Sequence, residues 1–535
     1  MTLAAARYES GAIVRGLQIG VIALAALFLA AVVALIAWER SWVAKEPSTP
    51  EDYFRFGSTG TEIMPLAVLQ VLPTLFPENF QPGGAAAGDW IDQFGFVRGR
   101  PGVNEGLPLG VNISRYRPKS GAPYPIPMVG FNCAVCHSAK LTVAGREDGT
   151  VVLGMANAGL DLVAFGEAVK SSVLDEKRLT MAAIETTYEG TMHNKLGLTD
   201  KLAIKLWLDG VRPAIKAEFP MRGHPYGGAD IRNPEFLLSG PGRNEPMKET
   251  VRFLIHQTPE PTGGSSKIPA LYRQDRRHWA QFDGSLGDPL LRNSLAALGV
   301  GASLDNLRMP GILNTIHETY TFVRDLEGPR FAETVGGDAG RIDTEHARGG
   351  AAVYAQYCTS CHGAPTADGK DWSKGQRQGD VIAQKELGTD PARVTFRFYG
   401  DLKQIVYDYF PEGHPLKPQL ADMRAEPEGA RGFVTEPLES VFSRGPYLHN
   451  GSVPTLAQLI NLVPRPNLFY RGASELDPVG VGIVSPAAAD AKHYYRFDTA
   501  AYGNSNRGHD YPWAYRGPGW NDDALKDLLE YLKTF

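Results

Sequence analysis

The strongest constraint on this chain is a five-residue pattern that occurs twice: CAVCH at residues 133–137 and CTSCH at residues 358–362. Cys-x-x-Cys-His is the attachment pattern of c-type haem. Its two thiols form thioethers with one porphyrin, and the histidine binds the iron from the proximal side. The sequence therefore predicts two covalently attached haem c groups with iron. The expected residues are Cys133, Cys136 and His137 for the first haem, and Cys358, Cys361 and His362 for the second.

Other chemistry of paired cysteines fits this pattern less well. Two Cys-x-x-Cys pairs that share one zinc ion usually have about 15–20 residues between them, far fewer than separate these two. A thioredoxin-like redox pair does not require a histidine after its second cysteine. Disulfides within each pair would close loops too short to stabilise the fold much. Zinc and redox dithiols are the alternatives to haem at these positions.

Composition indicates a globular protein and excludes one class of partner. Of the 535 residues, 43% are apolar and 21% are charged, as in ordinary globular domains. The net charge of −5 provides no basic surface for nucleic acid. Glycine (59 residues) and proline (39 residues) are abundant, which predicts many turns and long loops. The expected fold class is mainly α with long loops.

An uncharged apolar segment, residues 16–38, lies near the N-terminus. As a helix it would be about 34 Å long, enough to cross a hydrocarbon core of about 30 Å. Arg7 and Arg15 precede it and favour a cytoplasmic N-terminus for residues 1–15. We therefore expect a single-pass anchor in the cytoplasmic membrane, with the rest of the chain on the periplasmic side. A cleaved signal peptide, processed near residues 32–34, is the alternative.

The rest of the chain divides into three parts on sequence grounds. Residues 39–127 form an extracytoplasmic lead segment with few long periodic stretches. Residues 128–335 form the first haem c domain and residues 336–535 the second. The boundary between the two domains falls in the glycine-rich stretch 334–341.

Two helices are predicted at the ends of the second domain. Residues 344–357 should form a helix that leads directly into the second cysteine motif. Residues 521–535 carry an apolar stripe, with Asn521 as N-cap. Gly350 is small enough to let the first helix approach Leu528 and Tyr531 on the second.

Several segments resemble one family of cytochromes. RGPYLHNGSVPTL at residues 444–456 resembles the signature of the bacterial dihaem cytochrome c peroxidase superfamily. FYRG at 469–472, ELDP at 475–478 and GNSNRGH at 503–509 are closer to its rubber-oxygenase-like branch. The resemblance covers most of residues 128–535 and is strongest in the last 100.

The resemblance implies two cytochrome c domains with adjoining haems. One haem, held by two protein ligands, stores electrons, and the other is open to dioxygen or peroxide; in this branch the open haem is usually the N-terminal one. His509 matches the family's distal ligand of the C-terminal haem, so His362 and His509 are its expected iron ligands. No methionine follows Met423, which removes the methionine ligand that peroxidases use in this region.

For the first haem the sequence offers no strong distal ligand. Residues 138–192 contain no histidine, and Met155 is the nearest soft ligand. The alternative for Met155 is a core or pocket-lining role. Trp279 and Phe282 are candidate pocket or electron-path aromatics, although the family often has a tryptophan where this chain has Phe282. The catalytic residues are unknown, and an open or weakly ligated first haem is expected.

These features predict a membrane-anchored extracytoplasmic dihaem c-type cytochrome. It would be a peroxidase- or oxygenase-like oxidoreductase that acts on peroxide or dioxygen at the first haem, with electron transfer through the second. The alternatives are a pure electron-transfer cytochrome that serves a membrane redox complex, and a sensor of a diatomic ligand. An electron donor or acceptor protein, the membrane and a small oxidant are the expected partners. Calcium stays a possibility that no sequence motif supports.

Overall fold

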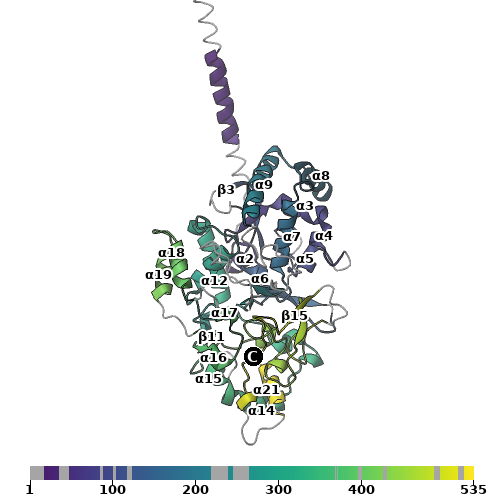
Figure 1. The fold of residues 1–535 in the computed structure, drawn as a ribbon, viewed down its shortest axis with the longest axis vertical. Coiled ribbons are helices and arrows are strands. Elements are labelled where there is room, and N and C mark those ends of the chain that lie inside the picture. The colour runs from purple at the N-terminus through teal and green to yellow at the C-terminus, as the bar shows by residue number, and fades with distance from the viewer. Residues whose placement is uncertain are drawn as a thin grey trace, which may run out of the picture. The chain divides into compact units, whose positions relative to one another are not determined.

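The computed structural model describes residues 17–34, 47–84, 88–99, 104–116, 123–146, 148–218, 239–244, 264–367, 369, 371–395, 400–425, 431–486, 494–515 and 523–535. Its contacts divide the chain into two units, Met1–Glu46 and Pro47–Phe535. The second unit contains both cysteine motifs (Figure 1). The predicted boundaries after residues 127 and 335 therefore do not separate compact domains.

The first unit contains one long apolar helix, Leu17–Ala34. Its mean hydropathy is 2.6, and none of it is buried. Water accommodates such a helix poorly, because the apolar side chains on every face remain exposed. The helix fits a single membrane span or a signal sequence. The predicted cytoplasmic segment 1–15 and the ends of the predicted span lie outside the described residues.

The compact unit begins with a three-stranded antiparallel sheet of order β1 (Glu62–Pro65), β3 (Pro123–Phe131), β2 (Val111–Tyr116). β3 leads directly into the first cysteine motif, so the lead segment is built into the first haem region. The helices of this region that lie between Pro50 and Glu218 include α2 (Pro50–Phe56), α3 (Leu66–Leu75), α4 (Pro77–Phe80), α5 (Trp90–Gln93), α7 (Leu162–Leu174), α8 (Met181–Met192) and α9 (Leu198–Glu218).

A second sheet joins the two haem regions. Its order is β14 (Gly482–Ile483), β13 (Glu475–Asp477), β4 (Ser138–Val143), β5 (Gly149–Leu153). β4 follows His137 directly, and β13, from the second region, pairs with β4 in parallel. The pairing places Leu141, Val143 and Leu476 in one buried cluster. This shared core is the physical reason why no domain boundary falls near residue 335.

The predicted helix crossing is present in the second region. α14 is Thr344–Tyr357, as predicted, and α21 is Ala524–Leu532; Asn521 lies outside the described residues. A Cβ atom on Gly350 would lie 2.0 Å from the backbone oxygen of Asp527. Because only glycine lacks this atom, Gly350 permits the close approach of the two helices.

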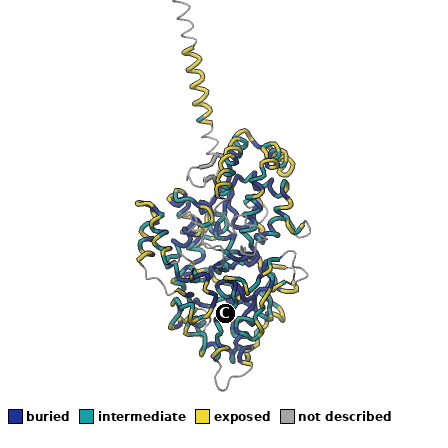
Figure 2. Tube along the Cα trace, in the orientation of Figure 1, coloured by how far each residue is buried: buried dark blue, intermediate teal, exposed yellow. Residues whose placement is uncertain are grey.

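A third core cluster is shared by helices from both regions: α11 (Pro289–Gly299), α12 (Pro310–Arg324), α18 (Leu402–Tyr409) and α19 (Lys417–Ala425). The unit is thus mainly helical, and its buried segments run through its centre (Figure 2). The remaining short elements are α6 (Cys133–Cys136), α13 (Phe331–Val335), α15 (Thr359–His362), α16 (Gln384–Leu387), α17 (Ala392–Thr395), α20 (Leu456–Leu459), β6 (Arg243–Asn244), β7 (Ser266–Lys267), β8 (Ala364–Pro365), β9 (Trp372–Ser373), β10 (Val381–Ala383), β11 (Gly432–Val434), β12 (Leu468–Arg471) and β15 (Tyr495–Asp498).

Candidate haem sites

The first cysteine motif forms a single helical turn, α6, whose start is fixed by Asn132. The Asn132 side-chain oxygen accepts a hydrogen bond from the backbone N–H of Ala134 at 3.0 Å, which caps the turn. The Nδ1 of His137 lies 2.9 Å from the backbone oxygen of Pro269. Nδ1 therefore carries the ring proton, and Nε2 keeps the lone pair that a metal ion requires. Burial lowers the pKa of His137 to about 4, so the imidazole stays neutral.

The four thiols lie in surroundings that disfavour thiolate chemistry. Burial raises the pKa of Cys133 to about 11 and those of Cys136 and Cys358 to about 12, and it also raises the pKa of Cys361. Reactive dithiols need the opposite environment, which lowers the thiol pKa. Within the described part of the chain, no three His, Cys, Asp or Glu side chains are grouped to hold a metal ion. These observations favour thioether attachment over zinc or redox dithiols.

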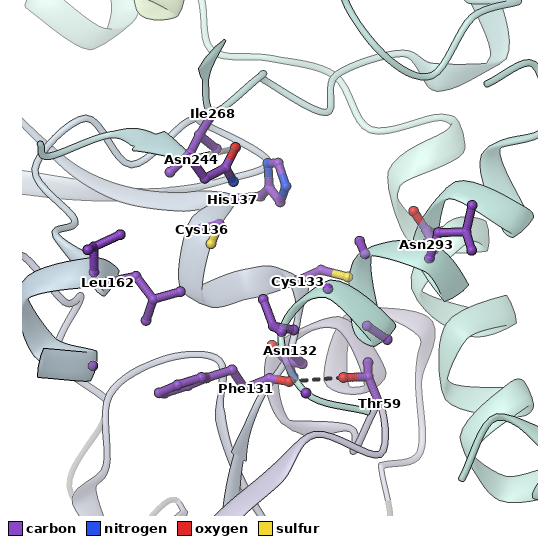
Figure 3. A pocket seen from close by; sticks show the side chains of 18 of the residues that line it. Thr59, Phe131, Asn132, Cys133, Cys136, His137, Leu162, Asn244, Ile268 and Asn293 are labelled. Carbon is purple, nitrogen blue, oxygen red and sulfur yellow. Dashed lines mark hydrogen bonds between the residues drawn. The ribbon is translucent and has the colours of Figure 1, made fainter. Parts of the chain in front are cut away.

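A cavity of about 510 Å³ lies beside the first motif (Figure 3). Its volume is within the range of about 300–1,000 Å³ that is typical of ligand sites. Cys133, Cys136 and His137 line it, with mostly apolar residues of α7, α9 and α11. Among its described lining residues, His137 is the one histidine, and Met64 and Met423 are the two methionines. The described lining thus offers no second imidazole to an iron that His137 binds.

The three candidate pocket residues from the sequence lie apart from this lining. Met155 is fully buried in the apolar cluster that contains β4 and β13, so it is a core methionine. The Trp279 indole donates to a backbone oxygen of the second region at 3.0 Å, and the Phe282 carbonyl accepts from a backbone N–H of that region at 2.8 Å. Ala280 and Gln281, between these aromatics, line the cavity instead. Trp279 and Phe282 therefore link the two regions.

The second motif forms the turn α15, directly after α14. The Nδ1 of His362 lies 2.7 Å from the backbone oxygen of Glu436, so Nε2 is again the nitrogen without a proton. The ring centres of His362 and His509 are 6.1 Å apart. Two imidazoles on opposite sides of one iron would have centres about 6 Å apart, because a metal–nitrogen bond is about 2 Å long and the ring centre lies about 1 Å beyond. The two rings are thus spaced as a pair of axial ligands.

The backbone of its loop holds His509 in position. Its N–H donates to the Leu387 oxygen at 2.8 Å, and its φ of 53° is a left-handed conformation that few non-glycine residues adopt. Its Nδ1 is buried without a hydrogen-bond partner among the described residues. Burial, with a smaller effect of His362, lowers the pKa of His509 to about 4. A neutral, buried imidazole that faces another imidazole suits a metal ligand.

His449, from the segment 444–456, is not placed as a ligand. Its ring stacks on Phe433, with the ring centres 4.0 Å apart. Burial is the largest cause that lowers its pKa well below the usual value. Its backbone oxygen accepts from the Lys267 N–H at 2.8 Å. These contacts fit a structural role for His449.

A buried arginine beside the first motif, Arg292, provides a test of whether the residues fit haem. Arg292 lines the first cavity, and its guanidinium donates to the neutral side chains of Gln274 and Asn293 at 2.9 and 3.1 Å. Its Nη2 is buried with no partner among the described residues. Burial lowers its pKa to about 10, because an uncompensated buried cation is unfavourable. Haem propionates are anions that would compensate it, so the residues fit the group.

Sequence reasoning missed Arg292 and the two methionines of the cavity. Lysine and arginine total 54 in the sequence, and nothing local distinguishes a buried arginine from an exposed one. Met64 and Met423 lie far from the first motif along the chain, and only the fold brings them to the cavity.

The two Cys-x-x-Cys-His turns and their histidines are the features expected of a haem c protein. Residues 432–470 match the family described as RoxA-like, cytochrome c-like. This match includes the segment 444–456 and supports the rubber-oxygenase-like branch. It does not confirm membership of the wider peroxidase superfamily. A cytochrome c-like domain implies covalently bound haem c with iron.

Two proteins of Sinorhizobium fredii are similar to this chain. The uncharacterized protein y4iJ is 27% identical, over 83% of this chain and 84% of that protein. The uncharacterized protein y4iM is 29% identical, over 52% of this chain and 66% of that protein.

Proposed function

We propose that the chain is a membrane-anchored, extracytoplasmic dihaem oxidoreductase that acts on dioxygen or peroxide at the first haem, with electron transfer through the second. The helix Leu17–Ala34 is its anchor, and both haem regions lie on the periplasmic side. The first haem has His137 as its one histidine ligand, and the second has His362 and His509. One observation carries the proposal: the His362 ring lies 6.1 Å from a second imidazole, that of His509, whereas His137 is the one histidine among the described residues that line the cavity where the first haem would bind.

Haem iron with an open position binds and activates dioxygen or peroxide, whereas iron held by two imidazoles transfers electrons. The residues of the chain decide which behaviour each site has. At the second site, His362 and His509 would both hold the iron, since their ring centres are 6.1 Å apart. At the first site, apolar side chains such as Leu162 and Ile268 line the cavity and would surround a bound haem, and Arg292 is available to hold a propionate.

A route of hydrogen bonds and covalent segments connects the two proximal histidines and supports electron transfer between the sites. Its four hydrogen bonds are 2.9, 2.5, 2.8 and 2.7 Å long. Between these hydrogen bonds the route follows covalent bonds of the backbone or of a side chain. Every step of the route is therefore either a covalent bond or a hydrogen bond. An electron donor or acceptor protein would exchange electrons with the second site. The members of the route, in order, are His137, Pro269, Lys267, Arg444, Pro437, Glu436 and His362.

The second candidate function is a pure electron-transfer cytochrome, and the two cavity methionines favour it. Thioether sulfur is a common sixth ligand of haem iron in electron carriers. If Met64 or Met423 binds the first iron, both haems are six-coordinate and neither is open to an oxidant.

Cyanide distinguishes the two functions. We expect one haem per chain of the oxidised, detergent-solubilised protein to shift its absorption spectrum on cyanide addition, and the other to remain low-spin. The same titration of the double variant Cys358→Ala and Cys361→Ala should assign the response to the haem attached at Cys133 and Cys136. If neither haem responds, oxidised or half-reduced, the electron-transfer function replaces the oxidoreductase.

Three methionine variants complete this experiment. Met155 is in the core, so Met155→Leu should leave the rate of cyanide binding unchanged and serves as the matched control. Met64→Leu and Met423→Leu should also leave the rate unchanged if the first iron is open. A clear acceleration in either cavity variant would identify that methionine as a sixth ligand.

A further inference from the structure

Exposed leucines lie on the outward face of α9, next to the exposed ion pair of Lys205 and Asp209. One side of the helix is buried in the core of the first haem region. Leu198, Leu202 and Leu206, four residues apart and therefore on one face, are 84%, 58% and 57% exposed. Leu198 is the most exposed large apolar side chain among the described residues. Met192, the last residue of α8, is also exposed and precedes them in the chain.

The charged residues that flank this face are already paired. The pairs are Lys195 with Glu189 at 3.1 Å, Lys201 with Glu185 at 2.7 Å, and Lys205 with Asp209 at 2.7 Å. The flanks are therefore electrically balanced. A strongly charged partner protein or a layer of anionic headgroups would gain little from such a face, whereas a neutral apolar phase would cover its leucines.

The size of the face also limits what can cover it. Three leucines and a methionine expose an apolar patch on the order of a few hundred Å². A stable dimer of two copies needs about 800 Å² from each partner, so this stripe alone is too small to hold a second copy. It is large enough for a helix that lies in a bilayer interface, with its apolar side about 5–10 Å into the headgroup and acyl boundary.

The proposed anchor would keep the compact unit close to a bilayer. Between the end of the anchor helix at Ala34 and the start of the compact unit at Pro47 there are twelve residues, which span at most about 43 Å. α9 packs against β1, which starts fifteen residues after Pro47. The short linker therefore keeps the sheet that contains β1, and α9 packed against it, at a high effective concentration near the lipid.

We propose that the outer face of α9 docks on the lipid bilayer through Leu198, Leu202 and Leu206. The inference rests on the retained anchor of the proposed function. Trp207, Val211 and Ile215, on the inner side of the same helix, line the first haem cavity. α9 then separates the cavity from the lipid by the thickness of one helix.

Spin-label accessibility in phosphatidylcholine nanodiscs with one full-length chain per disc tests this surface. A nitroxide is attached at Leu202→Cys, or at Val479→Cys, a matched control that is 80% exposed on a different element. Thioether formation protects the four natural cysteines from the label. Collision with apolar oxygen relative to a polar nickel chelate should be several-fold higher at position 202 than at 479. Adding Leu198→Gln and Leu206→Gln should bring position 202 down to the control.

Three outcomes would overturn the proposal. Equal accessibility at the two positions would leave the face in water. Protection of position 202 from both reagents would mean that protein covers it. If peptide mapping of the membrane-bound protein finds no peptide from residues 17–34, the mature chain has no anchor and the proposal fails. The cyanide response is measured separately and would still test the haem chemistry.

Discussion

The same five-residue pattern lies in two different surroundings. At residues 133–137 the histidine borders an apolar cavity of about 510 Å³. At residues 358–362 the histidine faces a second histidine, His509, at 6.1 Å between ring centres. Both histidines are fixed in the same way, by a hydrogen bond from Nδ1 to a backbone oxygen. The motif is therefore the same in both places, while segments distant in sequence give its histidine different surroundings.

Removal of one attachment site at a time should break this comparison most strongly. We expect the double variant Cys133→Ala and Cys136→Ala to keep one covalent haem, which is low-spin and indifferent to cyanide. The double variant Cys358→Ala and Cys361→Ala should keep the haem that responds to cyanide. The mass of the denatured chain counts the haems, and the spectrum identifies which remains. Two haems in either variant, or zinc in the native chain, would contradict the assignment.

The substitution His509→Ala should make the second site resemble the first. Loss of the imidazole donor should convert a low-spin signal to high-spin. It should also raise the reduction potential by on the order of 0.1 V, a fraction of the range of about 0.8 V that axial ligands span. Electron paramagnetic resonance and redox titration measure the two effects.

The exposed His193 supplies the control for this prediction, because His193→Ala should change neither property. A low-spin signal of the second haem that persists in His509→Ala would show that another residue is its ligand.

The smallest expected effect concerns charge at the first site. Arg292→Gln removes a buried cation beside the cavity, which should destabilise the reduced form relative to the oxidised form. The first potential should fall by some tens of millivolts, as expected for one charge about 10 Å away at an effective dielectric constant of about 20. The second potential should change less. Arg292→Lys keeps the charge and should restore most of the potential; equal shifts at both haems would argue against a local role.

Local features of the fold were accessible from the sequence, and long-range ones were not. α14 begins and ends at the predicted residues because its signals are local: Asp343 accepts hydrogen bonds from the first backbone N–H groups, and the motif follows its end. The parallel pairing of β4 with β13 joins strands about 330 residues apart, and no local pattern encodes it. Met155, which the sequence offered either as a soft ligand or as a core or pocket-lining residue, lies in the core, because proximity in sequence to His137 did not place it in the cavity.

The candidate site divides in the same manner. Cysteine spacing alone selected both motifs, and a family resemblance led to His509, whose ring centre lies 6.1 Å from that of His362. The haem attachment and the ligand roles stay predictions. Trp279 and Phe282 were selected as pocket aromatics, but their contacts are with the second region, so their electron-path role stays a prediction. Met64, Met423 and Arg292 could not be selected, because tertiary packing alone gives them their position.

The strand pairing that joins the regions has a consequence for modularity. β4 starts at the residue after His137, and its parallel neighbour β13 comes from the other half of the chain. Cutting the gene near residue 335 would leave each half with an unpaired strand edge and half of a shared core. The two halves are therefore not exchangeable modules. A duplication or swap of one cytochrome region would have to re-form the pairing of β4 with β13 and the core around it. Any coupling between the two centres is inherited with the fold as a whole.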